Sequence, residues 1–364
     1  MRILVAPDKF AGTLSAVEAA SAIEAGWRQT APDDELDLAP MSDGGPGFVD
    51  VLHEALGGEL LAVTVRGPLG APTPATVLVA GERGDVAYVE SAQACGLHLT
   101  RQERPEEAST YGVGELLAAA VDAGVSTVVV GLGGSGTTDG GAGLLAALGA
   151  TADVPLDAGG AGLAGVTGVD AGPARERIGS VRLVAASDVD NPLTGLFGAA
   201  KTFGPQKGIT EERLPVVDGW LEEYAAALDR RLALEKGAGA AGGLGYGLLV
   251  LGATREPGIS LVAEAVGLAE RARAADLVLT GEGAFDFSSG AGKVPHGVAT
   301  VAGEALRPCV VLAGKVLVGA REMRALGVES AYSLVDLVGE DRAFAEPAAA
   351  LTELAARTAR TWSR

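Results

Sequence analysis

The sequence has 364 residues, of which 48% are hydrophobic and only 4% aromatic, and its formal net charge is −19. That charge argues against binding to nucleic-acid backbones and to anionic membranes. The length exceeds what one ordinary core holds, so we expect two domains with cores built from Ala, Val and Leu.

The first sixty residues alternate short apolar strands with amphipathic helices. Ile3–Ala6 predicts a buried strand that ends in a loop containing Asp8 and Lys9. After a helix, Leu36–Ala39 predicts a second strand that ends just before Asp43. This β-α-β-α order predicts a parallel sheet with helices on its faces.

The middle of the chain contains a glycine-rich stretch between a strand and a helix. The segments Ala75–Ala80 and Val86–Val89 predict an antiparallel pair of strands, and Thr127–Val130 predicts a buried strand. Gly131–Gly136 follows it, and Asp139 stands where a helix could start. Such an arrangement presents backbone N–H groups to an anion, although it also suits a tight turn between core elements.

Alternating strands and helices return after about Ser260, following one long helix. A long amphipathic helix is expected over Thr210–Leu234, a strand over Leu277–Thr280 and a closing helix over Phe344–Trp362. We therefore predict a Rossmann-like α/β domain formed by residues 1–60 and 261–364, with residues 61–260 inserted as a second α/β domain.

Two further observations concern the location of the protein in the cell. The two cysteines, Cys95 and Cys309, are too few and too far apart in sequence to suggest a metal cage or a disulfide framework. The N-terminal apolar run is too short for a signal peptide, and no run approaches the roughly 18 apolar residues of a membrane span. We expect a soluble cytoplasmic protein.

Polar residues recur where the predicted strands end. In open parallel sheets, ligands bind at these carboxyl ends. Carboxylates that hold Mg²⁺, lysines and amides that hold phosphates, and a carboxylate that accepts a hydroxyl proton together describe phosphoryl transfer. Any single Asp could instead be a turn or cap residue. The set comprises Asp8, Lys9, Asp43, Ser135, Asp139, Asp188, Asn191, Glu282 and Asp286.

The use of lysine supports an anionic ligand. Only six of the 28 basic residues are lysines, yet Lys9, Lys201, Lys207 and Lys293 lie in or beside Gly/Pro-rich loops. Lysine acts on phosphate as a compact point charge, whereas arginine acts as a planar fork. The alternative is four chance surface lysines.

Nucleotide-binding motifs of the common kinds are weak or absent. Gly292-Lys293 lacks the upstream glycine and the following Ser/Thr of a Walker A loop. The pattern G-x-G-x-x-G begins at Gly131 and again at Gly237, and the first follows a strand, so an NAD-binding dehydrogenase is an alternative.

Taken together and in order, the loop motifs resemble the glycerate kinase type 1 family over nearly the whole chain. That resemblance implies ATP-dependent phosphorylation of D-glycerate, usually to 2-phosphoglycerate, with Mg²⁺ and an active site in a cleft between two α/β domains. A monomer or homodimer is expected. The motifs are Asp8-Lys9-Phe10, Ser42-Asp43-Gly44-Gly45, Gly133-Gly134-Ser135, Asp139-Gly140-Gly141, residues 188–193, residues 203–208, residues 237–245 and Thr280-Gly281-Glu282-Gly283.

Roles follow for individual residues. Asp188 is the candidate base, because a carboxylate at a strand end can accept the hydroxyl proton, and Lys9 and Lys207 are its catalytic partners. We expect nucleotide binding by Gly133, Gly134, Ser135, Gly281, Glu282, Gly283 and Lys293. We expect Mg²⁺ at Asp43 and Glu282, and substrate at Asp8, Asp139 and Asn191.

Four positions depart from the family pattern. Pro46 replaces an acid, Ala284 a basic residue, Thr138 an Asn and Ser288 a Gln. The changes at Pro46 and Ala284 leave two alternatives open: a kinase for another small hydroxy acid, or a relative that binds ligand without turnover.

Overall fold

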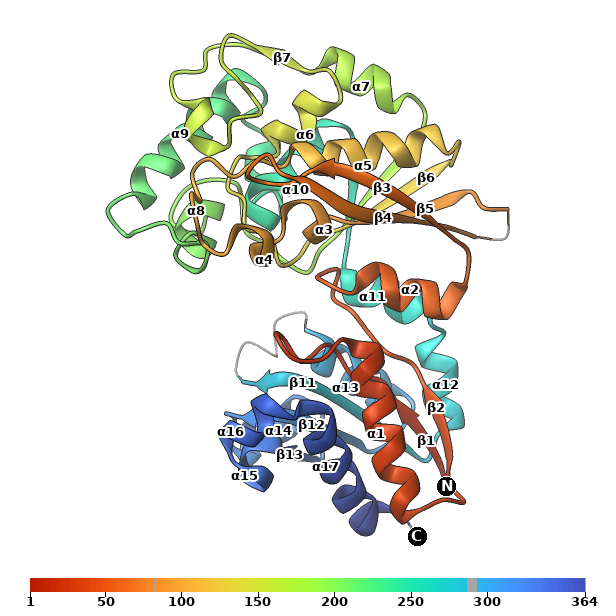
Figure 1. Cartoon of the computed structure of the whole chain (residues 1–364). Helices are drawn as coiled ribbons and strands as arrows, with labels where there is room; N and C mark the ends of the chain where they lie inside the picture. The colour runs from red at the N-terminus through yellow and green to blue at the C-terminus, as the bar shows by residue number, and fades with distance from the viewer. Residues whose placement is uncertain (82, 287–292, 364) are drawn as a thin grey trace. The chain divides into compact units, whose positions relative to one another are not determined.

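The computed structural model describes residues 1–81, 83–286 and 293–363, and the chain divides into two compact units. Unit 1 consists of Met1–Asp43, Asp50–Leu56 and Ile259–Arg364, and unit 2 consists of Gly44–Val49 and Gly57–Gly258. Figure 1 traces the chain through both.

Unit 1 is built on a five-stranded, fully parallel sheet with the order β13-β12-β11-β1-β2. The N-terminal strand lies inside this sheet, since Ile3 pairs with Leu277 on one side and with Leu36 on the other. The strands are β1 (Arg2–Val5), β2 (Glu35–Leu38), β11 (Leu277–Phe285), β12 (Cys309–Val316) and β13 (Ser330–Ser333).

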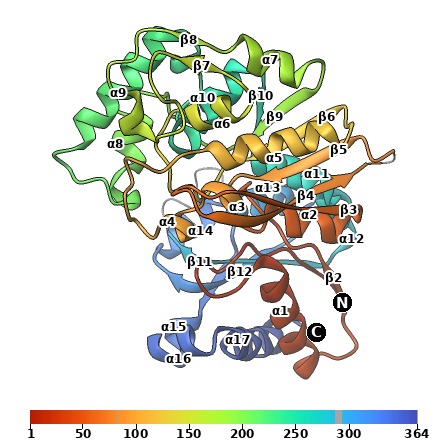
Figure 2. The same cartoon turned by 45° about the horizontal axis from the view of Figure 1, so that its top comes forward.

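Helices from both ends of the chain cover the sheet of unit 1. Figures 1 and 2 show α1 beside α17, with the two termini close together. Gly26 permits this packing, because a Cβ there would lie 2.0 Å from the carbonyl oxygen of Thr352. The helices are α1 (Ala16–Thr30), α12 (Leu268–Ala274), α13 (Val294–Glu304), α14 (Ala320–Ala325), α15 (Leu334–Val338), α16 (Glu340–Ala345) and α17 (Pro347–Trp362); α2 (Phe48–Leu56) and α11 (Gly258–Ala265) stand where the chain changes unit.

Unit 2 contains a six-stranded mixed sheet with the order β10-β9-β6-β5-β4-β3. The predicted antiparallel pair is confirmed, because Val77 of β4 pairs with Val89 of β5, while β5, β6, β9 and β10 are parallel. The strands are β3 (Glu59–Arg66), β4 (Pro72–Ala80), β5 (Val86–Glu90), β6 (Thr127–Gly131), β9 (Arg182–Ala186) and β10 (Thr254–Glu256), and β7 (Thr151–Ala152) pairs with β8 (Val169–Asp170).

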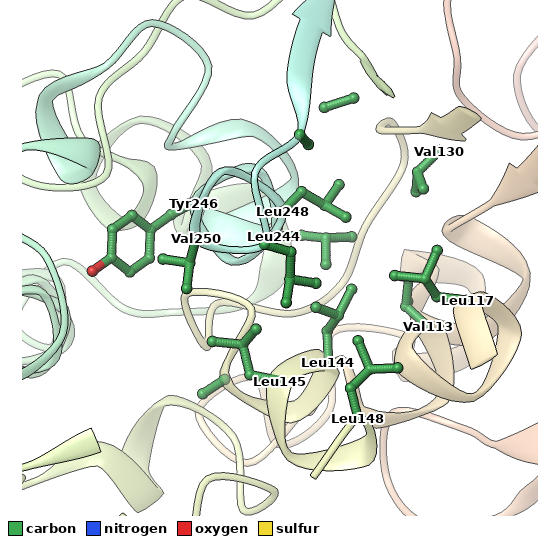
Figure 3. Packing of buried hydrophobic residues seen from close by; sticks show 14 of the residues in the cluster. Val113, Leu117, Val130, Leu144, Leu145, Leu148, Leu244, Tyr246, Leu248 and Val250 are labelled. Atoms are coloured by element: carbon green, nitrogen blue, oxygen red, sulfur yellow. The ribbon is translucent and has the colours of Figure 1, made fainter. Parts of the chain in front are cut away.

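The core of unit 2 is made of aliphatic side chains, as the low aromatic content requires. Figure 3 shows leucines of α6 packed between residues of α5 and α10. The helices are α3 (Ala92–Cys95), α4 (Leu97–Thr100), α5 (Tyr111–Asp122), α6 (Ala142–Ala147), α7 (Gly172–Ile178), α8 (Ala199–Phe203), α9 (Leu214–Ala227) and α10 (Ala240–Val250), with 3-10 turns η1 (Gly160–Leu163), η2 (Pro205–Lys207) and η3 (Leu232–Leu234).

The α/β class with mostly parallel sheets is thus as predicted, but two predicted helices are shorter than expected. The first ends at Ala227, since the side chain of Asp229 accepts hydrogen bonds from the backbone of Arg231 and Leu232 and starts a separate turn. The closing helix begins at Pro347, whose ring suits a first helical turn and breaks continuity with α16. No helix in the described part of the chain could span a membrane.

Candidate functional site

Unit 1 has a pocket of about 430 Å³ where β1, β2 and β11 end. Three carboxylates and three ammonium groups line it together with a larger apolar wall. The sequence predicted that Asp8, Lys9, Asp43 and Glu282 stand at the carboxyl ends of parallel strands. The charged residues of the lining are Asp8, Lys9, Asp43, Glu282, Lys293 and Lys315.

Lys9 lies between two of the carboxylates. Its Nζ is 3.5 Å from Asp8 Oδ1 and 3.5 Å from Asp43 Oδ1. Burial lowers the pKa of Lys9, but the two carboxylates outweigh that effect and leave the pKa raised. Burial also raises the pKa of Asp8 to about 6, although Lys9 opposes this rise. At neutral pH the group carries more carboxylate than ammonium charge, which suits a further cation.

The other wall of the pocket is formed by β11 and the start of α13. Glu282 is only 5% exposed, and its Oε2 is 3.9 Å from Lys293 Nζ. Gly281 holds the Asp8 loop, since its carbonyl accepts the backbone N–H of Asp8 at 2.8 Å. Gly283 lies against the same loop, where a Cβ would be 3.2 Å from the amide nitrogen of Ala11.

Unit 2 has a smaller pocket of about 250 Å³ above the predicted glycine turn. Gly133, Gly134 and Ser135 line it, and in the described structure their backbone N–H groups donate to no protein acceptor. Close approach explains the glycines, because a Cβ on Gly133 would lie 2.6 Å from the Cα of Gly45. The glycine turn therefore lines the pocket, and the binding of an anion by its backbone N–H groups stays a prediction.

Lys207 supplies the charge of this second pocket. It is 2% exposed, and its Nζ donates to Ser135 Oγ at 3.0 Å and to the carbonyl of Thr137 at 2.6 Å. Within the described residues it forms no ion pair. Burial lowers the pKa of Lys207 to about 8, against the raising effects of Cys95 and Asp139. A buried ammonium whose hydrogen-bond acceptors are neutral oxygens is stabilised by a nearby anion.

The second glycine cluster brings α10 against this ammonium. A Cβ on Gly242 would lie 2.7 Å from Lys207 Nζ and 1.9 Å from the carbonyl of Thr137, so only glycine fits. The residue before it, Ala241, lines the pocket with a left-handed φ of 51°. Backbone strain of this kind in a non-glycine residue gathers at functional sites.

Asp139 and Asn191 occupy structural positions beside the pocket. Asp139 is fully buried, and its carboxylate accepts hydrogen bonds from the backbone and hydroxyl of Thr110 and from the N–H groups of Gly141 and Gly143. Burial raises its pKa and these donors lower it, with a net rise. Its carboxylate holds the glycine turn that leads into α6, and Asp139 does not line the pocket. The side-chain Nδ2 of Asn191 donates to the carbonyl of Phe197 at 2.8 Å and so stabilises the loop that contains both residues.

Asp188 is half-buried and lies in the loop that follows β9. The residue before it, Ser187, is held by a hydrogen bond from its N–H to the carbonyl of Glu256, and Val189 lines the unit 2 pocket. The loop thus places Asp188 next to a pocket residue.

Three of the four positions that depart from the family pattern fall in the described parts of the chain. Pro46 packs on the glycine turn, since its Cδ would be 2.7 Å from a Cβ on Gly134. Thr138 is fully buried, and among the described residues its Oγ1 has no hydrogen-bond partner. Ala284 lines the unit 1 pocket, and Ser288 lies outside the described residues.

Sequence reasoning missed the apolar wall of the unit 1 pocket. It is formed by Phe10, Leu334, Val335, Ala343 and Phe344, most of which belong to α15 and α16. Short helices of this kind carry too few turns for a clear apolar period. The one available signal was Pro347, which separates Phe344 from the closing helix.

Comparisons with known proteins agree with this geometry. The model of the glycerate kinase family matches residues 3–363. The chain belongs to the glycerate kinase family. A glycerate kinase of Halalkalibacterium halodurans is 42% identical over 344 residues, covering 92% of this chain and 90% of that protein. The glycerate 2-kinase of Escherichia coli is 37% identical over 356 residues, covering 94% of this chain and 93% of that protein.

The fold is also similar to that of a solved structure from this family. The crystal structure of a candidate glycerate kinase 2 from Salmonella typhimurium LT2 matches with a TM-score of 0.79 and 37% identity, covering 99% of this chain and 98% of that one. The resemblance inferred from the loop motifs is confirmed, and the protein is a phosphotransferase of the glycerate kinase family. Nothing in these matches favours the dehydrogenase alternative.

Proposed function

We propose that this member of the glycerate kinase family transfers the γ-phosphoryl group of ATP to D-glycerate, most simply at the 2-hydroxyl to give 2-phosphoglycerate. The observation that supports the proposal is the buried Lys207 ammonium, which donates to two neutral oxygens, forms no ion pair among the described residues and shares its pocket with Gly133, Gly134 and Ser135. An anionic substrate would complete this site. D-glycerate carries a single carboxylate, which such a site can hold.

Unit 1 offers the groups that polyphosphate and Mg²⁺ need. Hard carboxylate oxygens suit Mg²⁺, which usually takes one or two protein carboxylates and completes its coordination with phosphate oxygens and water. Asp43 and Glu282 would hold it, and it would supply charge neutralisation on the phosphates.

The remaining residues of unit 1 then act on the nucleotide. Lys9 and Lys293 bind phosphate oxygens as point charges. Gly281 and Gly283 keep β11 close to the Asp8 loop, so that Asp8 orients Lys9 and stays near the metal. Burial of this group strengthens each electrostatic contact by lowering the local dielectric.

Unit 2 then acts on the acceptor. Gly133, Gly134, Ser135 and Lys207 hold an anionic group, and Asp188 accepts the proton of the attacking hydroxyl. Asp139 keeps α6 and the glycine turn in place, and Asn191 fixes the Asp188 loop. In this proposal both units contribute to one transition state, with water excluded so that ATP is not wasted.

The test is a coupled assay of ADP release with D-glycerate, L-glycerate, glycolate and glycerol as separate acceptors. We expect the fastest release with D-glycerate and a phosphorus NMR spectrum that places the product phosphate on the 2-hydroxyl. Release no faster with any acid than with buffer would refute the kinase proposal. Thermal stabilisation by ATP or glycerate without any turnover would instead support a relative that only binds ligand.

A further inference from the structure

The unit 1 pocket has two chemically different halves. The charged residues of the lining are Asp8, Lys9, Asp43, Glu282, Lys293 and Lys315, and Lys315 pairs with Glu340 of α16. The apolar half is closed by the short helices α15 and α16 that follow β13. Both halves line one continuous volume of about 430 Å³, so a single ligand can use both.

Phe344 is the unusual member of the apolar half. Its side chain is 58% exposed at the end of α16, whereas Phe10 in the same pocket is 2% exposed. Scattered exposed apolar residues need no explanation, but this ring lines a cavity beside Val335 and Ala343. An aromatic face left open at the rim of a pocket is a stacking surface for a flat ligand.

The proposed reaction supplies one such ligand. D-glycerate is polar along its whole length and cannot use an apolar wall. ATP has a flat, weakly polar base at one end and a highly charged polyphosphate at the other. The volume is in the range of about 300–1,000 Å³ typical of cofactor sites, whereas the unit 2 pocket has about 250 Å³.

We infer that the apolar half of the unit 1 pocket binds the purine base of the nucleotide and that Phe344 stacks on it. Val335 and Leu334 form the opposite apolar surface, and the polyphosphate extends toward Lys9 and Lys293. This inference rests on the proposed use of ATP and adds the site of base recognition, which the loop motifs did not indicate.

The experiment measures binding without turnover. Titration calorimetry compares ADP with inorganic tripolyphosphate, each with Mg²⁺, on the full-length wild type and on Phe344→Ala. Loss of a stacked aromatic side chain should raise the Kd for ADP about tenfold and leave the Kd for tripolyphosphate unchanged. Phe344→Tyr should restore ADP binding, because a tyrosine ring stacks equally well.

Leu317→Ala is the matched control. Leu317 is also 58% exposed and follows β12 in the same unit, but it does not line the pocket. It should leave both Kd values unchanged. Equal effects of Phe344→Ala and Leu317→Ala, or equal weakening of ADP and tripolyphosphate, would overturn the inference.

A second arm tests the competing position for the base. Phe203 lines the unit 2 pocket and is the other aromatic residue that could stack there. We expect Phe203→Ala to leave the Kd for ADP unchanged, and a weakening there with none in Phe344→Ala would move the base to unit 2. A wild type that binds ADP but forms none from ATP and D-glycerate would refute the proposed function and leave the base site standing.

Discussion

Lys9 and Lys207 are both loop lysines in largely buried surroundings, but their neighbours differ. Lys9 sits between two carboxylates in unit 1 and has a raised pKa. Among the described residues, Lys207 donates to a hydroxyl and a carbonyl in unit 2, and burial lowers its pKa to about 8. The first ammonium is already neutralised by protein, so it suits a site that also takes a metal and phosphates. The second has neutral oxygens as its hydrogen-bond acceptors among the described residues, and in the proposed function an anionic substrate supplies the opposite charge.

The largest effect should come from Lys207→Met. Loss of the ammonium removes the charged contact to the substrate anion, so kcat/KM for D-glycerate should fall on the order of 100-fold. Lys236→Met is the control, because Lys236 is 75% exposed and pairs with Asp190 at the surface. Unchanged activity in Lys207→Met would show that the unit 2 pocket does not bind substrate.

The same variant has a characteristic stability signature. Because the folded pKa of Lys207 is about 8 and the ordinary value is 10.5, the wild type gains stability as pH rises from 8 to 10.5. The buried charge costs roughly 3 kcal/mol at neutral pH. Lys207→Met should therefore unfold at a higher denaturant concentration at pH 7 and lose this pH dependence. Denaturant titration at several pH values measures both.

The next effect tests whether the two units serve one transition state. Lys9→Ala and Asp188→Ala should each lower kcat/KM for D-glycerate on the order of 100-fold without unfolding the protein. The double variant should lose much less than the product of the two, because residues that act on one transition state fail together. Fully additive losses in the double-mutant cycle would show that the Lys9 and Asp188 loops do not act on the same transition state.

A smaller effect concerns pH and unit 1 alone. Protonation of Asp8, with a pKa of about 6, removes one carboxylate from the pair around Lys9. The value of kcat/KM for ATP should therefore fall about tenfold per pH unit below 6. This fall of kcat/KM below pH 6 should be absent in Asp8→Asn. If kcat/KM still falls below pH 6 in Asp8→Asn, the titration belongs to another group.

Asp8 also affects stability. Since its folded pKa is raised, Asp8 stabilises the fold only at low pH, and that contribution is lost as pH rises through 6.

The smallest effect concerns backbone strain in the unit 2 pocket. Ala241 has a left-handed φ, which costs about 1–2 kcal/mol in a non-glycine residue, and glycine would relieve it at a smaller entropic cost. Ala241→Gly should therefore raise the free energy of unfolding by up to about 1 kcal/mol. Ala240→Gly, at a position that is not left-handed, should lower it. Equal losses in both variants would mean that Ala241 is not strained.

Strands and loop positions could be predicted from the sequence because apolar runs and glycine clusters are local signals. Ser135 and Lys207 were each recognised, but their contact spans 72 residues and no local pattern encodes it. The role of Asp139 could not be predicted from the sequence, because an Asp at the start of a helix can either hold the helix N-terminus or bind substrate. Phe344 was assigned to the closing helix because its apolar neighbours continue the pattern across Pro347.

The central place of β1 in the sheet of unit 1 has a consequence for synthesis on the ribosome. β1 pairs on one side with β11, which begins at Leu277, so its partner emerges roughly 240 residues after β2. At about 5–20 residues per second, the N-terminal strands and α1 wait about 12–50 s for that partner. All the strands of unit 2 are translated during this interval. The N-terminal strands and the apolar face of α1 around Ile23 and Trp27 therefore lack β11 as a packing partner until that strand leaves the exit tunnel.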